Sequence, residues 1–217
     1  MAELKLDISM SLDGFIAGPN PSREQPLGEG GERLHEWAFG LASWRERHGK
    51  PGGDANVDSE VLEETMAGTG ANVMGKGMFG GGEGPWGDEP WEGWWGDDPP
   101  FDTPVFVLTH HPREPLKKGS TTFTFVSDGI ESALEQAREA AGDRDVVLGG
   151  GASVAQQYMK AGLLDELQFH VVPVLMGEGI RLFEGHLDGD LAELECMRVI
   201  DSPEVTHLRY RVRRSQP

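Results

Sequence analysis

The clearest chemical signal in this chain is a short apolar run that ends in three consecutive glycines. Residues 145–148 have the pattern of a buried strand, residues 149–151 are all glycine, and residues 152–159 have helical spacing. Glycine lets a ligand approach the backbone closely, and the free N–H groups of a first helical turn attract anions. We therefore expect a phosphate or pyrophosphate group to bind at Gly150, Gly151, Ala152 and Ser153. The alternative is a turn that only packs a strand against a helix.

This glycine turn differs from the dinucleotide-binding fingerprint, in which glycines occupy the first, third and sixth positions. Ala152 and Ser153 break that spacing. Ser153 is expected either to cap the following helix or to donate to the bound phosphate.

Two more groups that suit a phosphate follow other predicted strands. Gly75 and Lys76 come after a buried-looking run at residues 71–74, and Thr109 and His110 open a cluster of two histidines and an arginine after a strand at residues 104–109. The histidine pair also suits a metal ion, but no third ligand stands at a recognisable spacing. Ligands of open sheets bind outside the carboxyl ends of the strands, so these groups are predicted to converge on the glycine turn. A solvated surface lysine is the alternative for Lys76.

Residues 70–77 nearly spell the phosphate loop of nucleoside triphosphatases. Gly77 stands where that motif needs a Ser or Thr for Mg²⁺, and residues 71–74 have strand character where it needs a loop. These two departures exclude an ATPase.

Composition limits the class of protein and its partners. The chain has 217 residues, which suits one domain over residues 1–217, and its net charge of −18 repels nucleic acid and anionic membranes. The single cysteine, Cys196, excludes an intrachain disulfide. The N-terminal residues lack a signal-peptide pattern, and no segment has the apolar length of a membrane span. We therefore expect a cytoplasmic protein.

The order of predicted elements indicates the fold class. Alternating residues 4–10 predict a first strand, a helical spacing covers residues 32–47 with Trp37 on its apolar face, and Asp58 and Ser59 suit the cap of a second helix. Strands and helices then alternate, and two strands near residues 191–200 and 205–213 close the chain as a hairpin. This predicts an α/β fold with a mixed, mostly parallel central sheet, helices on both faces and a C-terminal antiparallel hairpin.

A long segment at about residues 80–103 interrupts this pattern. Residues 80–102 hold four of the six tryptophans, seven acidic residues and no basic one. Disordered segments are poor in aromatic residues, so the tryptophans favour an ordered, functional loop. It is expected to be either a lid that stacks a planar substrate or a contact between subunits.

Several motifs occur in the order seen in dihydrofolate-reductase-like proteins, and the chain resembles that family over nearly its whole length. These motifs are SMSLDGFIA at residues 9–17, VMGK at 73–76, VFVLT at 105–109 and LGGG at 148–151. Two others, LLDEL at 163–167 and PVLMGEG at 173–179, are similar to the pyrimidine reductase domain of riboflavin biosynthesis, which forms the C-terminal part of a deaminase-reductase.

The resemblance implies an NADPH-dependent oxidoreductase that acts on a planar nitrogen heterocycle. The first substrate to consider is 5-amino-6-(5-phosphoribosylamino)uracil, and dihydrofolate or another pterin is the second. The negative loop at residues 80–102 disfavours a doubly charged phosphate substrate and leaves room for a neutral heterocycle. A nucleotide-binding sensor without turnover is the alternative from another class, and a homodimer is expected by resemblance.

The resemblance also assigns residues to the cofactor. The pyrophosphate would lie on Gly150, Gly151, Ala152 and Ser153, the adenosine ribose and its 2′-phosphate near Gly75, Lys76, Thr109 and His110, and the nicotinamide against Ser9, Ile16 and Ala17.

The source of the substrate's proton is less well defined. Folate reductases carry a carboxylate on the first helix, and residues 32–47 offer no acid that aligns with it. Asp13 and His35 are the catalytic candidates, since histidine can donate a proton near neutral pH. An ordinary Asp-Gly turn and a surface histidine are the alternatives. His170 and Trp37 are predicted to contact substrate, and a satisfied core histidine is the alternative for His170.

Overall fold

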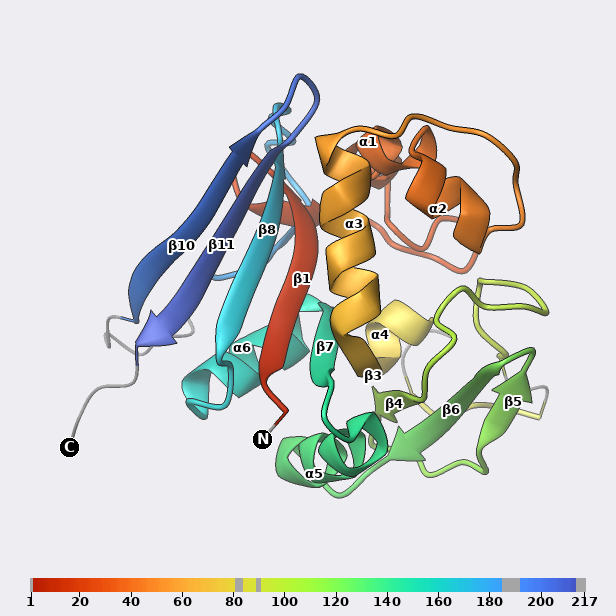
Figure 1. Cartoon of the computed structure of the whole chain (residues 1–217). Helices are drawn as coiled ribbons and strands as arrows, with labels where there is room; N and C mark the ends of the chain where they lie inside the picture. The colour runs from red at the N-terminus through yellow and green to blue at the C-terminus, as the bar shows by residue number, and fades with distance from the viewer. Residues whose placement is uncertain (1, 81–83, 89–90, 185–191, 214–217) are drawn as a thin grey trace.

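A nine-stranded mixed sheet organises the computed structural model, which describes residues 2–80, 84–88, 91–184 and 192–213 (Figure 1). In the order in which they lie side by side, the strands are β10 (Glu193–Asp201), β11 (Thr206–Arg213), β8 (Glu166–Val172), β1 (Leu4–Ser11), β7 (Asp145–Gly150), β3 (Thr69–Gly75), β4 (Val105–Leu108), β6 (Thr121–Val126) and β5 (Leu116–Lys118). The pairs from β8 to β6 are parallel, and the pairs at both edges are antiparallel. The predicted fold class is confirmed.

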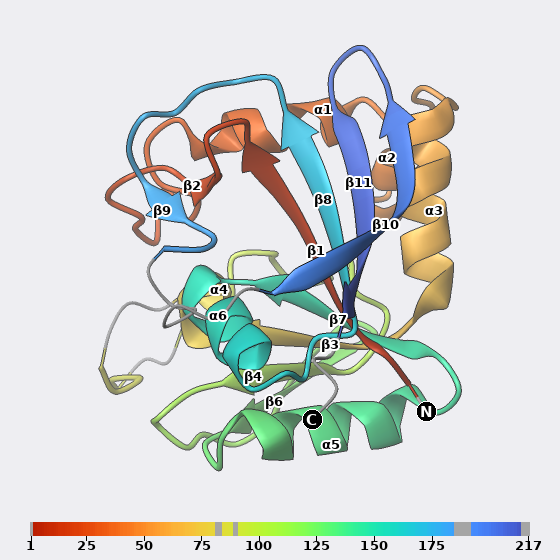
Figure 2. The same cartoon turned by 90° about the vertical axis from the view of Figure 1, so that its left-hand side faces the viewer.

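Helices cover both faces of the sheet. Figure 2 shows α3 (Val57–Gly68) on one side of β1 and α6 (Ala152–Lys160) on the other, while α5 (Ile130–Ala141) packs with α6 against β3, β4 and β7. The helix α5 buries Ala133, Leu134 and Ala137, which repeat at the spacing of one helical face. Parallel strands between two helical layers are buried on both faces, and this explains the continuous apolar runs of the central strands.

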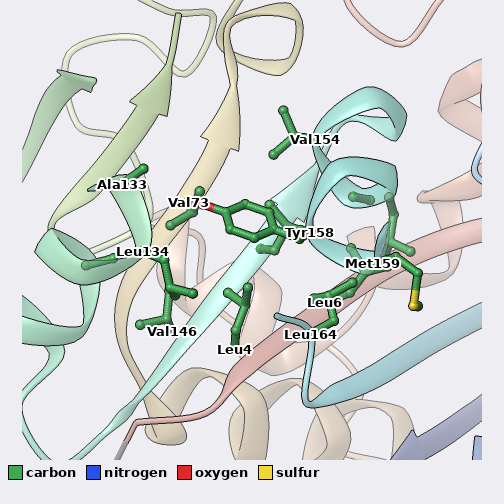
Figure 3. Close-up of a cluster of buried hydrophobic side chains, with 14 of the residues drawn as sticks. Leu4, Leu6, Val73, Ala133, Leu134, Val146, Val154, Tyr158, Met159 and Leu164 are labelled. Carbon is green, nitrogen blue, oxygen red and sulfur yellow. The ribbon is translucent and has the colours of Figure 1, made fainter. Parts of the chain in front are cut away.

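The main core lies between the sheet and the α5–α6 layer. Leu4, Leu6, Val73 and Val146 contribute from the strands and meet Tyr158 of α6 (Figure 3). Tyr158 is fully buried, and its hydroxyl donates to the Ile130 carbonyl over 2.8 Å, so that the polar group is satisfied at the start of α5.

The helix predicted over residues 32–47 is wrong as a single element. The chain forms a 3₁₀ turn η1 (Gly31–Leu34) and two short helices, α1 (Glu36–Phe39) and α2 (Ala42–Arg47). The Ala42 N–H donates to the Asp54 carbonyl and the Asp54 N–H to the Gly40 carbonyl, both over 3.0 Å. These bonds to another segment replace the helical hydrogen bonds, so the apolar spacing continues while the helix does not.

The predicted cap of the second helix is also wrong. The side chain of Asn56 accepts from the N–H groups of Asp58 and Ser59 and therefore caps α3. Asp58 therefore does not cap the helix, and it is buried against the sheet.

Two short strands that the sequence pattern did not predict form a second small sheet. They are β2 (Phe15–Ala17) and β9 (Ile180–Arg181), and they lie beside the carboxyl end of β1. Elements of two or three residues are too short for a periodicity to be recognised.

The described part of the tryptophan-rich segment builds a second core on the β4–β6 side of the sheet. The indole N–H groups of Trp86, Trp91 and Trp94 donate to the carbonyls of His111, Phe79 and Met78, respectively. Phe79 belongs to the short helix α4 (Lys76–Phe79) and is fully buried among aromatic rings. This packing within the chain is a role that the sequence analysis did not foresee, and the predicted roles as lid or subunit contact stay predictions. Residues 81–83 and 89–90 of the segment lie outside the described residues.

Candidate active site

The glycine turn joins β7 to α6 as predicted. Gly150 ends the strand with φ +131°, a value that side chains rarely adopt, and the peptide bond to Gly151 is cis. Gly151 is the N-cap of α6, and its carbonyl accepts from the N–H groups of Val154 and Ala155. The amides of Ala152 and Ser153 precede the first helical hydrogen bond and face the end of the helix, where an anion is stabilised.

Ser153 does not cap α6, and that alternative is wrong. The cap residue is a glycine without a side chain, and the Ser153 Oγ instead accepts from the Gln157 amide over 3.3 Å. The second predicted task of Ser153, donation to a phosphate, stays a prediction.

Gly151 differs from the neighbouring glycines in its surroundings. A Cβ atom added at Gly75 would lie 2.8 Å from the Val154 side chain, so close packing of β3 against α6 explains that glycine. A Cβ added at Gly151 would meet no atom within 4 Å, and its φ of −83° suits any residue. The space in front of Gly151 is therefore open and lies at the N-terminus of α6.

The strand register brings the three predicted phosphate contacts to one edge of the sheet. Gly150 of β7 pairs with Met74 of β3, and Gly75 pairs with Leu108 of β4. The residues that follow, Lys76 and Thr109, therefore lie at the same edge as the glycine turn. Their convergence is confirmed, and their roles in binding stay predictions.

The cations at this edge surround a tryptophan. The Lys76 Nζ lies 4.5 Å from the ring centre of Trp86, and the Arg113 guanidinium carbon lies 5.0 Å from it. Thr109 is buried, and its Oγ1 accepts from the His111 N–H over 3.1 Å, whereas His110 is exposed. Arg113 was noted in sequence only as part of a positive cluster, and its contact with Trp86 depends on how residues 84–88 fold back.

The predicted nicotinamide contacts lie near the carboxyl end of β1. Ile16 and Ala17 are buried in β2, and Ile16 joins the same core cluster as Ile8. Ser9 is buried in β1, and its Oγ accepts from the Trp37 indole N–H over 3.2 Å. Trp37 and Ser9 are thus brought into direct contact, although 28 positions separate them in the chain.

Asp13 holds two loops together. Its carboxylate accepts from the Ser11 hydroxyl over 2.6 Å, from the Met176 N–H over 3.1 Å and from the Gly177 N–H over 2.8 Å. These bonds, with the Ser11 contact the largest cause, lower the pKa of Asp13 to about 2. The carboxylate is therefore ionised near neutral pH and holds no proton to donate. A positioning role fits these contacts, and a catalytic role for Asp13 stays a prediction.

His35 is partly buried beside the start of α1. Burial, together with the charge of nearby His170, lowers the pKa of His35 to about 4. His35 is therefore a neutral imidazole near pH 7. Its catalytic role also stays a prediction.

A row of titratable side chains lies between α3 and the sheet. The His170 Nε2 lies 3.1 Å from an Asp7 oxygen, the His170 Nδ1 lies 2.6 Å from the His207 Nδ1, and the His207 Nε2 lies 3.0 Å from an Asp58 oxygen. The Trp37 ring covers both imidazoles, with ring centres 4.9 and 5.2 Å away. We call Asp7, His170, His207 and Asp58 the acid–base row.

The sequence analysis found only His170 of this row. Asp7 was only part of the alternation that predicts the first strand, Asp58 was assigned to a helix cap, and His207 was assigned no role. The available signal was a polar residue every second position on β1, β8 and β11 in strands whose other face is apolar. Asp58 is also a carboxylate near the start of the first long helix, which is the feature sought among residues 32–47.

No helix among the described residues is long and apolar enough to cross a membrane.

Comparison with known proteins supports this fold. A solved protein from Shewanella sp. PV-4, described as a candidate riboflavin biosynthesis protein, has a TM-score of 0.62 at 19% identity and covers 99% of this chain and 100% of its own. Dihydrofolate reductase from Enterococcus faecalis, solved with NADP(H) and the compound RAB-propyl, has a TM-score of 0.51 at 14% identity and covers 97% and 96%. At these identities the likeness is one of fold.

At the level of sequence, the uncharacterised protein YyaP of Bacillus subtilis (strain 168) is 36% identical over 92 residues, which are 40% of this chain and 48% of that protein. The match thus spans about half of that relative's length. The family model for the RibD C-terminal domain matches residues 2–208, nearly the whole chain. The chain therefore belongs to the RibD C-terminal domain family and has the dihydrofolate-reductase-like fold.

Proposed function

We propose that this chain is an NADPH-dependent reductase of a planar nitrogen heterocycle. The observation that carries the proposal is the open space in front of Gly151, at the edge where Lys76 and Thr109 also lie. No contact within the described chain requires glycine there, whereas a diphosphate on the Ala152 and Ser153 amides would occupy that space. Family membership supports an oxidoreductase, and the cofactor is part of the proposal.

The residues present fit this cofactor. The amides at the start of α6 would hold the pyrophosphate, and Lys76, Thr109 and His110 would hold the adenosine ribose and its 2′-phosphate, with Arg113 added beside Trp86. Ser9, Ile16 and Ala17 would line the nicotinamide, which supplies a hydride when bound. The chain's own residues then need only orient the substrate and supply a proton.

The first substrate to test is 5-amino-6-(5-phosphoribosylamino)uracil, which the family and the riboflavin-related neighbour support. The negative segment at residues 80–102 weakens this choice less than the sequence suggested, because Glu92 and Asp97 both pair with Lys118, over 3.0 and 3.5 Å. A pterin such as dihydrofolate is the second substrate.

Titration calorimetry and a turnover assay test the proposal together. Purified protein is titrated with NADPH, and NADPH oxidation is then followed with the uracil substrate, dihydrofolate and neutral heterocycles. Binding with oxidation in the presence of one heterocycle supports the reductase. Tight binding without oxidation by any of them favours the nucleotide sensor, and no heat with NADPH refutes both.

We also propose a homodimer through the face of β10 and β11 on which Leu208, Tyr210 and Val212 of β11 are partly buried against the main core. Leu194 pairs with Val212, Cys196 with Tyr210 and Val199 with Leu208, so these six uncharged side chains share one face. Leu194 and Val199 are 41% and 57% exposed at the sheet edge. In a chain of net charge −18, such a face is where a second copy avoids like-charge repulsion.

Light scattering tests this assembly. A dimer mass for the native chain and a monomer mass for Val199→Glu are expected, with Glu195→Gln on the opposite side of β10 as the control. A monomeric native chain would refute the dimer. The expected cytoplasmic location stays a prediction.

A further inference from the structure

The acid–base row joins four elements through an unbroken series of short contacts. Asp7 comes from β1, His170 from β8, His207 from β11 and Asp58 from α3. His170, His207 and Asp58 are only 2%, 3% and 5% exposed. Water therefore cannot compensate a missing hydrogen bond in the middle of the row, and the contacts must be satisfied from within it.

The contacts determine how many protons the row holds. The two Nδ1 atoms face each other at 2.6 Å, so one donates and the other accepts. The contacts of His170 with Asp7 and of His207 with Asp58 each need one more proton. Three contacts thus require three protons, and two neutral imidazoles supply only two. Without the third proton, two lone pairs would face each other at a buried contact.

The charges around the row favour this third proton. Asp7 and Asp58 lie at its two ends, and His35 is the further titratable group within electrostatic reach of His170. The pKa of His207 is lowered overall, with burial as the largest cause and the charge of His170 adding to it, while the hydrogen bond to Asp58 and the charges of Asp58 and Asp7 act in the opposite direction. Interacting groups of this kind titrate as a set, so the third proton belongs to the row and to no single residue.

One end of the row reaches solvent. The side chain of Asp7 is 18% exposed, and its second oxygen accepts from the Gln168 amide over 2.9 Å and from the Thr65 hydroxyl over 3.3 Å. The other side of the row lies under Trp37, which contacts Ser9. The row therefore connects a solvent-facing carboxylate with the residues predicted to contact nicotinamide and substrate.

We propose that Asp7, His170, His207 and Asp58 act as one buried acid–base unit that holds a transferable third proton for the substrate. This use of the proton rests on the proposed function, because reduction of a C=N bond requires one proton at nitrogen. An N–H bond forms on the substrate as a bond to the third proton breaks in the row. The row keeps two protons, and Asp7 takes a replacement from water. Because a proton moves only between atoms in contact, the proposal requires one member of the row to reach the substrate nitrogen; that member is the catalytic residue and the other three are positioning residues.

Nitrogen NMR of the imidazoles tests the unit in the protein without ligands. The full chain is labelled at its histidines and titrated between about pH 5 and 9. We expect the nitrogens of His170 and His207 to change together in one step, and exposed His48, whose signals are assigned with a His48→Asn control, serves as a reference outside the row. Two independent steps at different pH values would overturn the proposal.

The variant Asp58→Asn removes the third proton while it preserves the contacts. The Asn amide can donate to the His207 Nε2, so two neutral imidazoles complete the row. We expect the shared step to disappear, the NADPH dissociation constant to stay within twofold and kcat to fall at least tenfold with KM little changed. A shared step that persists in this variant would overturn the proposal.

The outcomes separate this inference from the proposed function. Failure of the shared step in the native chain overturns the acid–base unit even if a heterocycle is reduced. A shared step without reduction of any heterocycle refutes the proposed function and leaves a unit that holds a proton. The NMR titration of the native chain tests the acid–base unit even if Asp58→Asn fails to fold.

Discussion

The cofactor edge and the acid–base row lie in the same sheet but are built in opposite ways. The cofactor edge consists of short consecutive motifs at the ends of β7, β3 and β4, with open space at Gly151. The acid–base row takes single residues from four elements and buries them almost completely. A site that faces open space can change its affinity without unfolding the chain, whereas a buried row couples its chemistry to stability.

The variant Gly151→Leu is expected to separate an effect on cofactor affinity from an effect on stability most clearly. Its side chain would enter the open space and block the amides at the start of α6, so the NADPH dissociation constant should rise roughly 100-fold, about 2.8 kcal/mol. The midpoint of thermal unfolding should change little, because the backbone at Gly151 suits other residues. Calorimetry and a thermal melt check this, with Gly68→Leu in α3, which also faces open space, as the control. Unchanged affinity would remove the turn from the cofactor site.

For His170→Leu we expect the opposite result, a large loss of stability with little change in NADPH affinity. The substitution removes the His170 contact of Asp7 and of His207 in a buried layer, which should cost about 2–4 kcal/mol of unfolding free energy. NADPH affinity should stay within a few-fold of the native value. Urea unfolding and calorimetry provide the two measurements. Equal losses in stability and affinity would show that the two regions are not separable.

A smaller effect is expected at the cation of the cofactor edge. In Lys76→Ala, the preference for NADPH over NADH should fall roughly tenfold, because a charge-assisted contact with the 2′-phosphate is lost. Dissociation constants for both cofactors measure this preference, and replacement of the exposed Lys117 of β5 in Lys117→Ala is the control. If the preference does not change, Lys76 does not contact the 2′-phosphate.

The smallest effect concerns acid pH. Asp13 has a pKa of about 2 in the folded chain against its ordinary value of 3.8, so its contribution to stability is present above about pH 4 and is lost as pH falls toward 2. In Asp13→Asn this part of the pH dependence should disappear, since the amide carries no charge. Urea unfolding at several acid pH values measures it. If the unfolding free energy of the variant falls with acid pH as steeply as that of the native chain, other carboxylates dominate the acid dependence.

Predictions from the sequence were most successful where the signal lies in consecutive residues. The strand predicted over residues 104–109 is β4 (Val105–Leu108), and the glycine turn and the strand ends at Lys76 and Thr109 lie where expected. The predictions were wrong where a distant segment competes for hydrogen bonds. The spacing over residues 32–47 is helical, but Asp54 takes bonds that a continuous helix would need.

The same distinction between local signals and distant contacts applies to the candidate site. Asp7 and Asp58 each had a sufficient local explanation, as part of an alternating strand and as a helix cap, and nothing in the neighbouring sequence contradicted it. Each became part of the acid–base row only because the fold places β8 between β1 and β11 and packs α3 over these strands.

The sequence by itself determined the alternation of strands and helices, the glycine turn and the edge at which its partners gather, because periodicity and turn chemistry are local properties. The tertiary structure alone decided which polar side chains meet beneath Trp37 and how many protons they share. That outcome depends on contacts up to 163 positions apart in the chain, where local propensities carry no information.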